Sequence, residues 1–106
     1  MRAGRLRQRV TIQQRAGTQD SYGQLDDDWD DVATVWGAVE PLRGREFLEA
    51  RREGADVTTR IVIRHRPGVT PAMRVSYDSR VFDIQTVINT DERDRELVLM
   101  CRELVT

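Results

Sequence analysis

The stretch from Arg80 to Val105, RVFDIQTVINTDERDRELVLMCRELV, decides the fold class. Its two apolar runs, 81–88 and 96–105, are separated by the charged turn 91–94. Short runs rich in β-branched and aromatic residues between turn residues predict antiparallel strands. Both runs carry apolar side chains on both strand faces, so one face would line the interior and the other would need a cover. That cover could be a helix, a docked loop or a neighbouring subunit.

Outward from this stretch, the rest of the chain adds further strands with the same patterning. Apolar and polar residues alternate strictly at 6–15 and 57–65, as they do in half-buried strands. Two more runs are expected to be strands, 29–39, which Pro41 closes, and 73–77. The 106 residues therefore predict one mainly β domain, 1–106, folded as a small antiparallel β-barrel of about six strands.

One short helix interrupts the strands. Good helix formers fill 42–54, with Gly44 near the start and Gly54 where a helix would end. A helix of about nine residues is not stable alone in water. We therefore expect it to dock on the rest of the domain through Phe47, Leu48 and Ala50.

A long loop is expected between the first two strands, at 16–28. The segment is rich in Gly, Asp, Gln and Ser, and only Tyr22 and Leu25 are available for burial. Ordering about a dozen residues costs roughly 1–2 kcal/mol each. The sequence therefore predicts a flexible loop that contacts with other molecules would order, and loops of this length are usually functional or disordered.

The charges are balanced overall and separated locally. Seventeen arginines oppose eighteen acidic residues, for a net charge of −1, so the basic surplus of a free-standing duplex-DNA binder is absent. Residues 1–15 nevertheless carry five arginines and no acid, and 16–32 carry six aspartates and no base. Arg5, Arg7 and Arg9 share one strand face and are candidate phosphate or subunit contacts, with a solvated face or pairing with the acidic loop as the alternatives.

Residue patterns for catalysis or metal binding are scarce. Asp26, Asp28 and Asp30 have the spacing of a calcium loop, but its sixth position is Asp31 and its twelfth is Gly37, which excludes an EF-hand. We find no phosphate-binding glycine loop, serine elbow or zinc-protease motif. The sequence predicts no catalytic, cofactor-binding or metal site, and hence no enzyme and no cofactor.

Single residues support the same interpretation. The only histidine, His65, is expected to be a packed or half-exposed residue at a strand end, and the only cysteine, Cys101, a buried structural one. An enzyme hypothesis would have to use Asp27 or Asp28 with His65, within hydrogen-bond reach. Trp36 and Phe82 are expected in the core rather than stacked on nucleic-acid bases. No transmembrane or signal segment is apparent, and the lone cysteine fits a reducing compartment, so a cytoplasmic protein is expected.

Five segments, in their order and spacing, resemble the tailed-phage head-tail joining family, whose members are also called head-closure, stopper or adaptor proteins. The resemblance covers nearly the whole chain. The segments are LRQRVTIQ (6–13), TQDSYGQ (18–24), DVATVWGAVEPLRGREF (31–47), RPGVTPAMRV (66–75) and RVFDIQTVINTDERDREL (80–97).

This resemblance implies a small β-barrel with one helix, twelve copies of which form a ring below the portal and adaptor proteins. Such a ring closes the DNA exit channel after packaging, contacts DNA without sequence specificity and docks the tail proteins, with no membrane involved. The protein would be in the host cytoplasm during assembly and then in the neck of a phage, prophage or gene transfer agent particle. In that setting the loop becomes a candidate channel or partner contact through Asp20, Tyr22, Gly23, Gln24, Asp26, Asp27 and Asp28. The alternative function is a small nucleic-acid-binding β-barrel.

Overall fold

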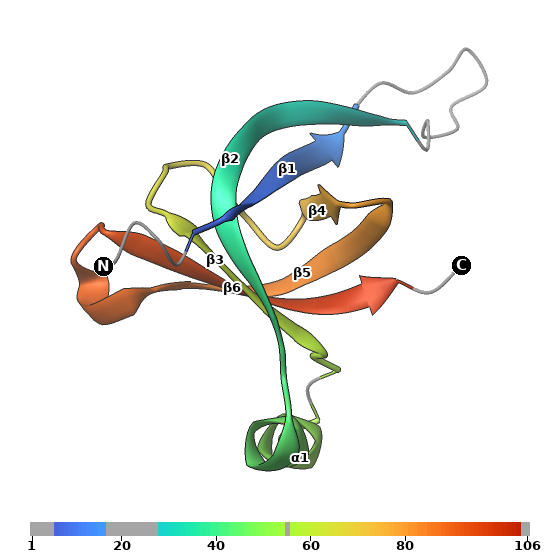
Figure 1. Ribbon diagram of the computed structural model, residues 1–106, viewed down its shortest axis with the longest axis vertical. Coiled ribbons are helices and arrows are strands. Elements are labelled where there is room, and N and C mark those ends of the chain that lie inside the picture. Colours follow the sequence, from blue (N-terminus) through green and yellow to red (C-terminus); the bar gives the residue numbers. More distant parts are fainter. Residues whose placement is uncertain (1–5, 17–27, 55, 105–106) are drawn as a thin grey trace.

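The computed structural model describes residues 6–16, 28–54 and 56–104, and its strands close into an antiparallel barrel (Figure 1). The strands follow the order β1-β2-β3-β6-β5-β4 around the barrel, and β4 pairs back onto β1. The predicted fold class is confirmed. The strands are β1 (Gln8–Arg15), β2 (Trp29–Pro41), β3 (Thr59–Arg64), β4 (Arg74–Tyr77), β5 (Arg80–Asn89) and β6 (Glu96–Leu104).

Tight turns fix the register of the second half of the barrel. Asp78 and Ser79 join β4 to β5 with φ values of 50° and 63°. Two consecutive positive φ values are typical of the hairpin turn whose twist matches the flanking strands. The short helix η2 (Thr90–Glu92) lies in the turn between β5 and β6.

The barrel interior is filled by the inward-facing residues of its strands, which are almost all apolar, and Thr59 of β3 is the buried polar residue among those described. Phe82 of β5 is its largest fully buried side chain, and Cys101 is buried as expected. Gly37 of β2 is required by close packing, because a Cβ there would lie 3.0 Å from the carbonyl oxygen of Val62. The cluster comprises Val10, Ile12, Ile61, Ile63, Val75, Phe82, Ile84, Leu97, Leu99 and Cys101.

A second apolar cluster lies on the outside of the barrel, so the prediction of apolar side chains on both faces of the last strands is confirmed. Ala38 and Val62 are buried there together with Leu6, and Val98 of β6 packs against them. The cover is Leu6, from the segment that precedes β1. At this cluster the cover is therefore internal, and a neighbouring subunit over the rest of the outer face stays a prediction. Ile88, on β5 opposite Val98, stays 44% exposed.

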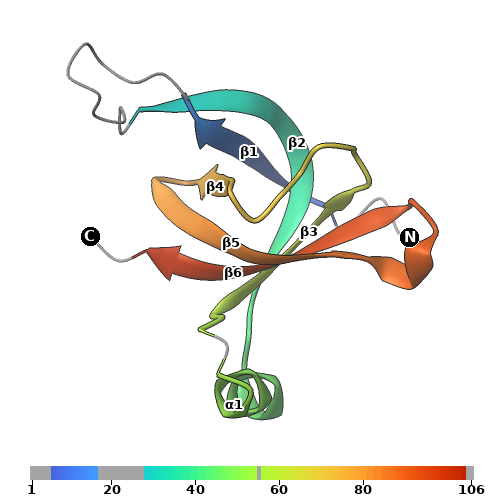
Figure 2. The ribbon, with the colours of Figure 1, turned by 180° about the vertical axis from the view of Figure 1, so that it is seen from behind.

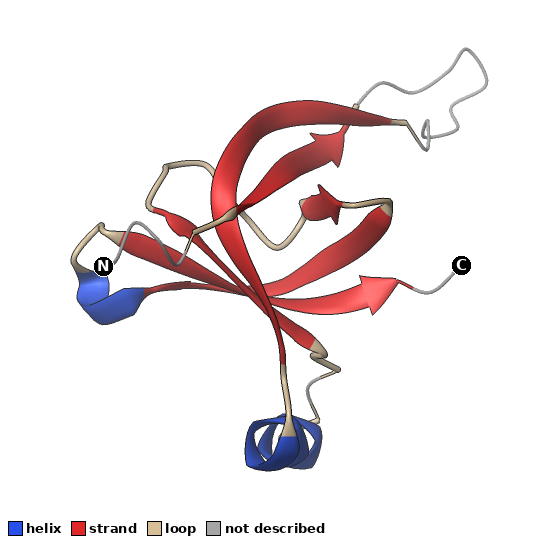
Figure 3. Ribbon diagram, in the orientation of Figure 1, coloured by secondary structure: helices blue, strands red, loops and turns tan. Residues whose placement is uncertain are grey.

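The helix α1 (Gly44–Arg52) forms as predicted but does not dock. It stands beyond the end of β2, away from the strands, in both views (Figures 1 and 2), and the colouring by structure shows it joined to the barrel only by loops (Figure 3). None of its residues is buried, and Leu48 is 57% exposed. The expectation that Phe47, Leu48 and Ala50 pack on this domain is therefore wrong, because the barrel closes without them.

Polar contacts and one apolar anchor hold the base of α1. Arg60 of β3 bonds to Glu40 of β2, at 3.1 Å, and to Glu46 of α1, at 2.5 Å. Burial alone would lower the pKa of Arg60, but the hydrogen bonds that Arg60 donates to both carboxylates, and their charges, outweigh it and raise that pKa. Leu42 is buried, and its N–H donates to the carbonyl oxygen of Thr58. The helix is thus fixed at its base while its outer side faces solvent. In the described part of the chain no helix is long and apolar enough to span a membrane.

Candidate partner-binding surfaces

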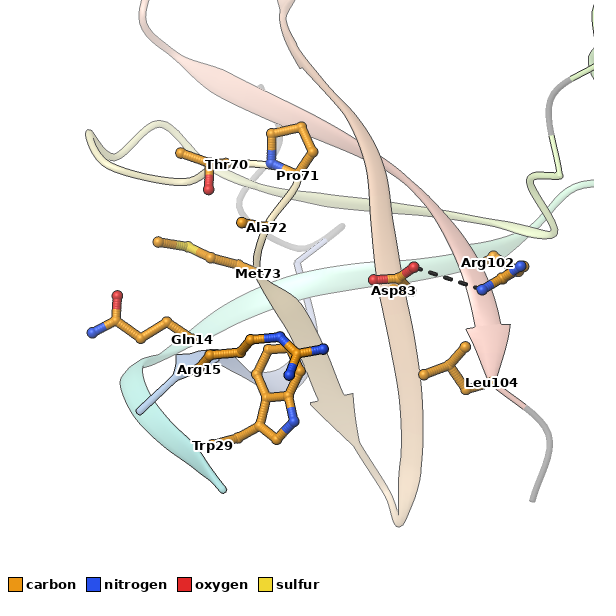
Figure 4. Close-up of a pocket in the computed structure, with 10 residues that line it drawn as sticks. All are labelled: Gln14, Arg15, Trp29, Thr70, Pro71, Ala72, Met73, Asp83, Arg102 and Leu104. Atoms are coloured by element: carbon orange, nitrogen blue, oxygen red, sulfur yellow. Dashed lines mark ion pairs between the residues drawn. The ribbon is translucent and has the colours of Figure 1, made fainter. Parts of the chain in front are cut away.

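A hollow of about 590 Å³ opens where the ends of β1 and β2 meet the segment before β4 (Figure 4). We call it the loop-base hollow, because the predicted loop leaves β1 and enters β2 here. Its floor is mostly apolar and its rim carries both charges. The lining residues are Gln14, Arg15, Trp29, Thr70, Pro71, Ala72, Met73, Asp83, Arg102 and Leu104.

Two guanidinium groups lie over the indole of Trp29 at this hollow. The guanidinium carbons of Arg15 and Arg74 are 5.1 Å and 4.2 Å from the centre of the ring. Burial, and then the nearby charge of Arg15, lowers the pKa of Arg74. The Nε of Arg74 donates to Gln13 at 2.7 Å, which fixes the guanidinium beside the ring. Cation–π contacts therefore hold like charges together at one place on the surface.

On the opposite rim the charges are paired within the chain. Arg102 lies 3.8 Å from Asp83 and 3.2 Å from Asp56. This surface could not be predicted from the sequence, because its parts come from β1, β2, β5, β6 and the segment before β4. The available signal was that Arg15 and Trp29 flank the predicted loop 16–28, one on each side.

Most of the predicted loop contacts lie outside the described residues. These are Asp20, Tyr22, Gly23, Gln24, Asp26 and Asp27. Asp28 is described and exposed, and its carbonyl oxygen accepts a hydrogen bond from the N–H of Ala16 at 3.1 Å. That bond closes the base of the loop and brings its two ends together.

The predicted arginine row is placed in part. Arg5 lies outside the described residues, whereas Arg7 and Arg9 are exposed. Arg9 lies directly opposite Trp36 in the β1–β2 register, and its guanidinium stacks 4.9 Å from the centre of that indole. Trp36 is 51% exposed, so its assignment to the core is wrong, whereas Phe82 is buried as expected. The alternation in β2 could have placed Trp36 on the outside, because Val35 and Gly37 face inward.

Of the residues in the enzyme hypothesis, Asp28 and His65 are described, and they lie on different parts of the barrel. His65, partly buried at the end of β3, has its Nε2 3.4 Å from Asp94 in the β5–β6 turn. Asp27 lies outside the described residues. Gly37 of β2 pairs with Ile63, which is two residues before His65, whereas Asp28 is nine positions before Gly37. Asp28 and His65 are therefore far apart along the sheet. Burial, and then the charge of Asp83, raises the pKa of the Cys101 thiol to about 12, which keeps it protonated and unreactive.

Metal-binding side chains do not cluster either. In residues 6–16, 28–54 and 56–104, no three acidic, histidine or cysteine side chains are grouped so as to hold a metal ion.

Comparisons with known proteins then decide the family. The family model described as phage head completion protein matches residues 1–104. The chain belongs to the phage head completion protein family. It is thus a structural protein of the kind that the resemblance indicated. No curated protein sequence matches this phage head completion protein.

Two solved structures are similar over nearly the whole chain. The solution structure of protein SF1141 from Shigella flexneri 2a is 31% identical, with a TM-score of 0.75, covering 97% of this chain and 96% of that one. A chain from the virion of a native gene transfer agent particle is 24% identical, with a TM-score of 0.67, covering 96% of this chain and 98% of that one. The second likeness shows a shared fold.

Proposed function

We propose that this head completion protein is a head-tail connector that acts by the geometry of a ring rather than by catalysis. Copies of the chain assemble below the portal and adaptor proteins, close the DNA exit channel after packaging and offer the surface on which the tail docks. The observation that carries the proposal is the family match over residues 1–104. The virion chain with the same fold supports a place in a phage or phage-like particle.

The surface of the barrel also supports a role in assembly. Apolar side chains remain partly exposed on several strands and on the helix, among them Val32, Trp36, Leu48, Ile88 and Leu104. Arginine and carboxylate side chains surround them, so we expect subunit contacts of mixed character that weaken as the salt concentration rises. The isolated chain is accordingly expected to be a monomer or weak oligomer that needs the adaptor as a template for its ring.

The test is electron microscopy of the purified protein mixed with its portal–adaptor complex. The proposal predicts an additional ring, twelvefold by family resemblance, on the adaptor end of the complex. Particles made without the protein should package DNA but lose it and lack tails. Tailed particles that retain their DNA without the protein would overturn the proposal, and so would a complex that binds the protein only at the capsid end.

We further propose that the ring retains DNA by obstruction rather than by phosphate contacts. With a net charge of −1 per subunit, a ring of many copies does not attract DNA overall, and the aspartates of segment 16–32 would repel phosphates in the channel. Replacing Arg5, Arg7 and Arg9 together should then leave retention in filled particles unchanged, whereas shortening the loop between Thr18 and Asp28 should cause leakage. Leakage from an arginine variant whose ring and loop are intact would favour phosphate contacts instead.

One observation favours the alternative, a nucleic-acid-binding barrel. The exposed Trp36 beneath Arg9 offers an aromatic face next to a cation, as single-strand-binding surfaces do. That function requires an affinity for nucleic acid that falls steeply with salt, because phosphate contacts release counterions. A weak affinity that salt does not change would exclude it.

A further inference from the structure

The helix α1 lies at one end of the molecule and exposes an apolar side chain that does not pack on the rest of the described chain. Leu48 is 57% exposed, and a hollow of about 390 Å³ beside it is lined by Gly44, Arg45, Leu48, Glu49 and Arg52. Arg45, Leu48 and Arg52 lie three and four positions apart, so they share one helix side. A helix this short has little stability of its own, yet ion pairs and a buried leucine hold its base in place. It is therefore presented to solvent in a fixed position.

The opposite end of β2 carries a surface of complementary character. The β1–β2 register shifts between Ile12, which faces Ala33, and Gln13, which faces Asp31, so Val32 has no partner across the pair. Bulges of this kind redirect a side chain, and Val32 is 38% exposed. Asp30 and Asp31 precede it, both exposed. The start of β2 thus offers the exposed Val32 beside Asp30 and Asp31, of which Asp31 also accepts a hydrogen bond from Gln13 at 2.8 Å. Beyond the other end of β2, the exposed Leu48 lies with Arg45, Arg52 and Glu49, which together carry a net positive charge.

These two surfaces cannot meet within one chain. The strand that separates them has 13 residues, and the molecule extends 46 Å along its longest axis, with α1 at one end of that axis (Figure 1). A cyclic ring of more than two copies needs heterologous contacts, in which each subunit offers two different surfaces that fit one another. The helix and the start of β2 are two different surfaces, each with an exposed aliphatic side chain, and their net charges are opposite.

We propose that α1 of one copy docks on the start of β2 of the next copy, with Leu48 against Val32 and with Arg45 and Arg52 facing Asp30 and Asp31. This inference rests on the proposed ring and names the surfaces that build it. The second copy is chosen as the occupant because this chain itself supplies the acidic, apolar surface that the basic side of the helix fits. The same contact gives a reason for a helix that buries nothing in its own domain.

The first arm of the test is disulfide cross-linking in assembled particles that carry Leu48→Cys together with Val32→Cys. The native Cys101 is buried and protonated, so it does not interfere. The proposal predicts a ladder of cross-linked multimers after mild oxidation, with no ladder from either single variant. The matched control pairs Leu48→Cys with Ile88→Cys, since Ile88 is an exposed aliphatic residue on another face, and it should give none.

The second arm reverses the charges. A helix variant, Arg45→Asp with Arg52→Asp, and a strand variant, Asp30→Arg with Asp31→Arg, should each enter particles about tenfold less than the wild-type chain, or worse. When the two variant chains are supplied together, incorporation should be restored. The acidic helix of one variant then faces the basic strand of the other, and the unchanged helix of the second faces the unchanged strand of the first. Arg93→Asp with Arg95→Asp makes the same charge change as the helix variant in the β5–β6 turn and should have no effect.

The outcomes separate this contact from the proposed function. Chain present in particles without the Leu48–Val32 ladder overturns the helix contact and leaves the connector role intact. A ladder from the Ile88 pair, or charge variants that do not rescue each other, also overturns it. Wild-type chain that is absent from assembled particles overturns the proposed function itself.

Discussion

The barrel interior and the helix α1 are opposite cases within one short chain. The interior buries ten side chains from five strands, and all of them are buried by other residues of the same chain. The helix buries none, although its sequence carries two large apolar side chains, Phe47 and Leu48. The difference indicates that the barrel specifies the fold, whereas α1 serves a contact outside its own domain. If so, substitutions in the barrel interior should destabilise the isolated chain far more than substitutions in α1.

The largest effect is expected at the centre of the interior. Phe82→Ala removes the largest fully buried side chain and leaves a cavity that β4 and β6 cannot fill. We expect it to lower the free energy of unfolding by about 3–5 kcal/mol in urea denaturation. Phe82→Leu, which keeps most of the volume, should cost much less. If Phe82→Ala costs under about 1 kcal/mol, the interior is not the source of stability.

A smaller loss is expected at the cover of the outer cluster. Leu6→Ala uncovers Ala38 and Val62 at the barrel surface, where the chain can settle onto the gap, so we expect about 1–2 kcal/mol in the same measurement. Gln14→Ala, at an exposed position of β1, serves as the control. Equal stability of the two variants would show that the N-terminal segment does not cover this cluster.

An exposed ion pair should matter less and should depend on pH. Arg80 donates two hydrogen bonds to Glu103, at 2.9 and 2.8 Å, and they lower the pKa of Glu103. A lowered folded-state pKa stabilises the protein above the unfolded value of about 4.3, and this contribution is lost as the pH falls through the folded-state pKa. Because both side chains are partly exposed, Glu103→Gln should cost about 0.2–1 kcal/mol at neutral pH.

Denaturation of the wild-type chain and Glu103→Gln from neutral pH to about pH 2 checks the sign. The two stabilities should converge at the acidic end. A difference that grows as the pH falls would contradict the assignment.

The smallest effect on the isolated chain is expected at α1. Leu48→Ala removes an exposed side chain and should change stability by no more than about 0.5 kcal/mol. Leu99→Ala, the same substitution at a fully buried position of β6, should cost about 2–5 kcal/mol. A loss above about 2 kcal/mol at Leu48 would mean that the helix packs on its own barrel.

The sequence predicted the barrel because its information is local. Alternation along 57–65 and the two-residue turn at Asp78 and Ser79 determine strands and hairpins without reference to distant residues. The same patterns predicted that α1 forms. They could not say where it lies, because amphipathic patterning marks an apolar helix side and not the surface that covers it.

The surfaces were harder to predict for a related reason. Arg15 and Arg74 meet on Trp29 only because β4 closes the barrel against β1, a pairing of residues 61 to 65 positions apart in sequence. Burial of the outer cluster by Leu6 depends likewise on the path of the chain before β1. Trp36 was expected in the core rather than stacked on nucleic-acid bases, although its place in the alternation put it outside.

Hydrogen exchange tests the central claim, that the barrel is self-sufficient and that α1 is completed by another molecule, most directly. In the isolated protein we expect the amides of β3, β5 and β6 to exchange only through global unfolding and those of 47–52 to exchange far faster. In assembled particles the amides of α1 should become protected while those of the strands change little. Protection of α1 as strong as that of β3 in the isolated monomer would contradict the account, and so would an α1 that remains unprotected after assembly.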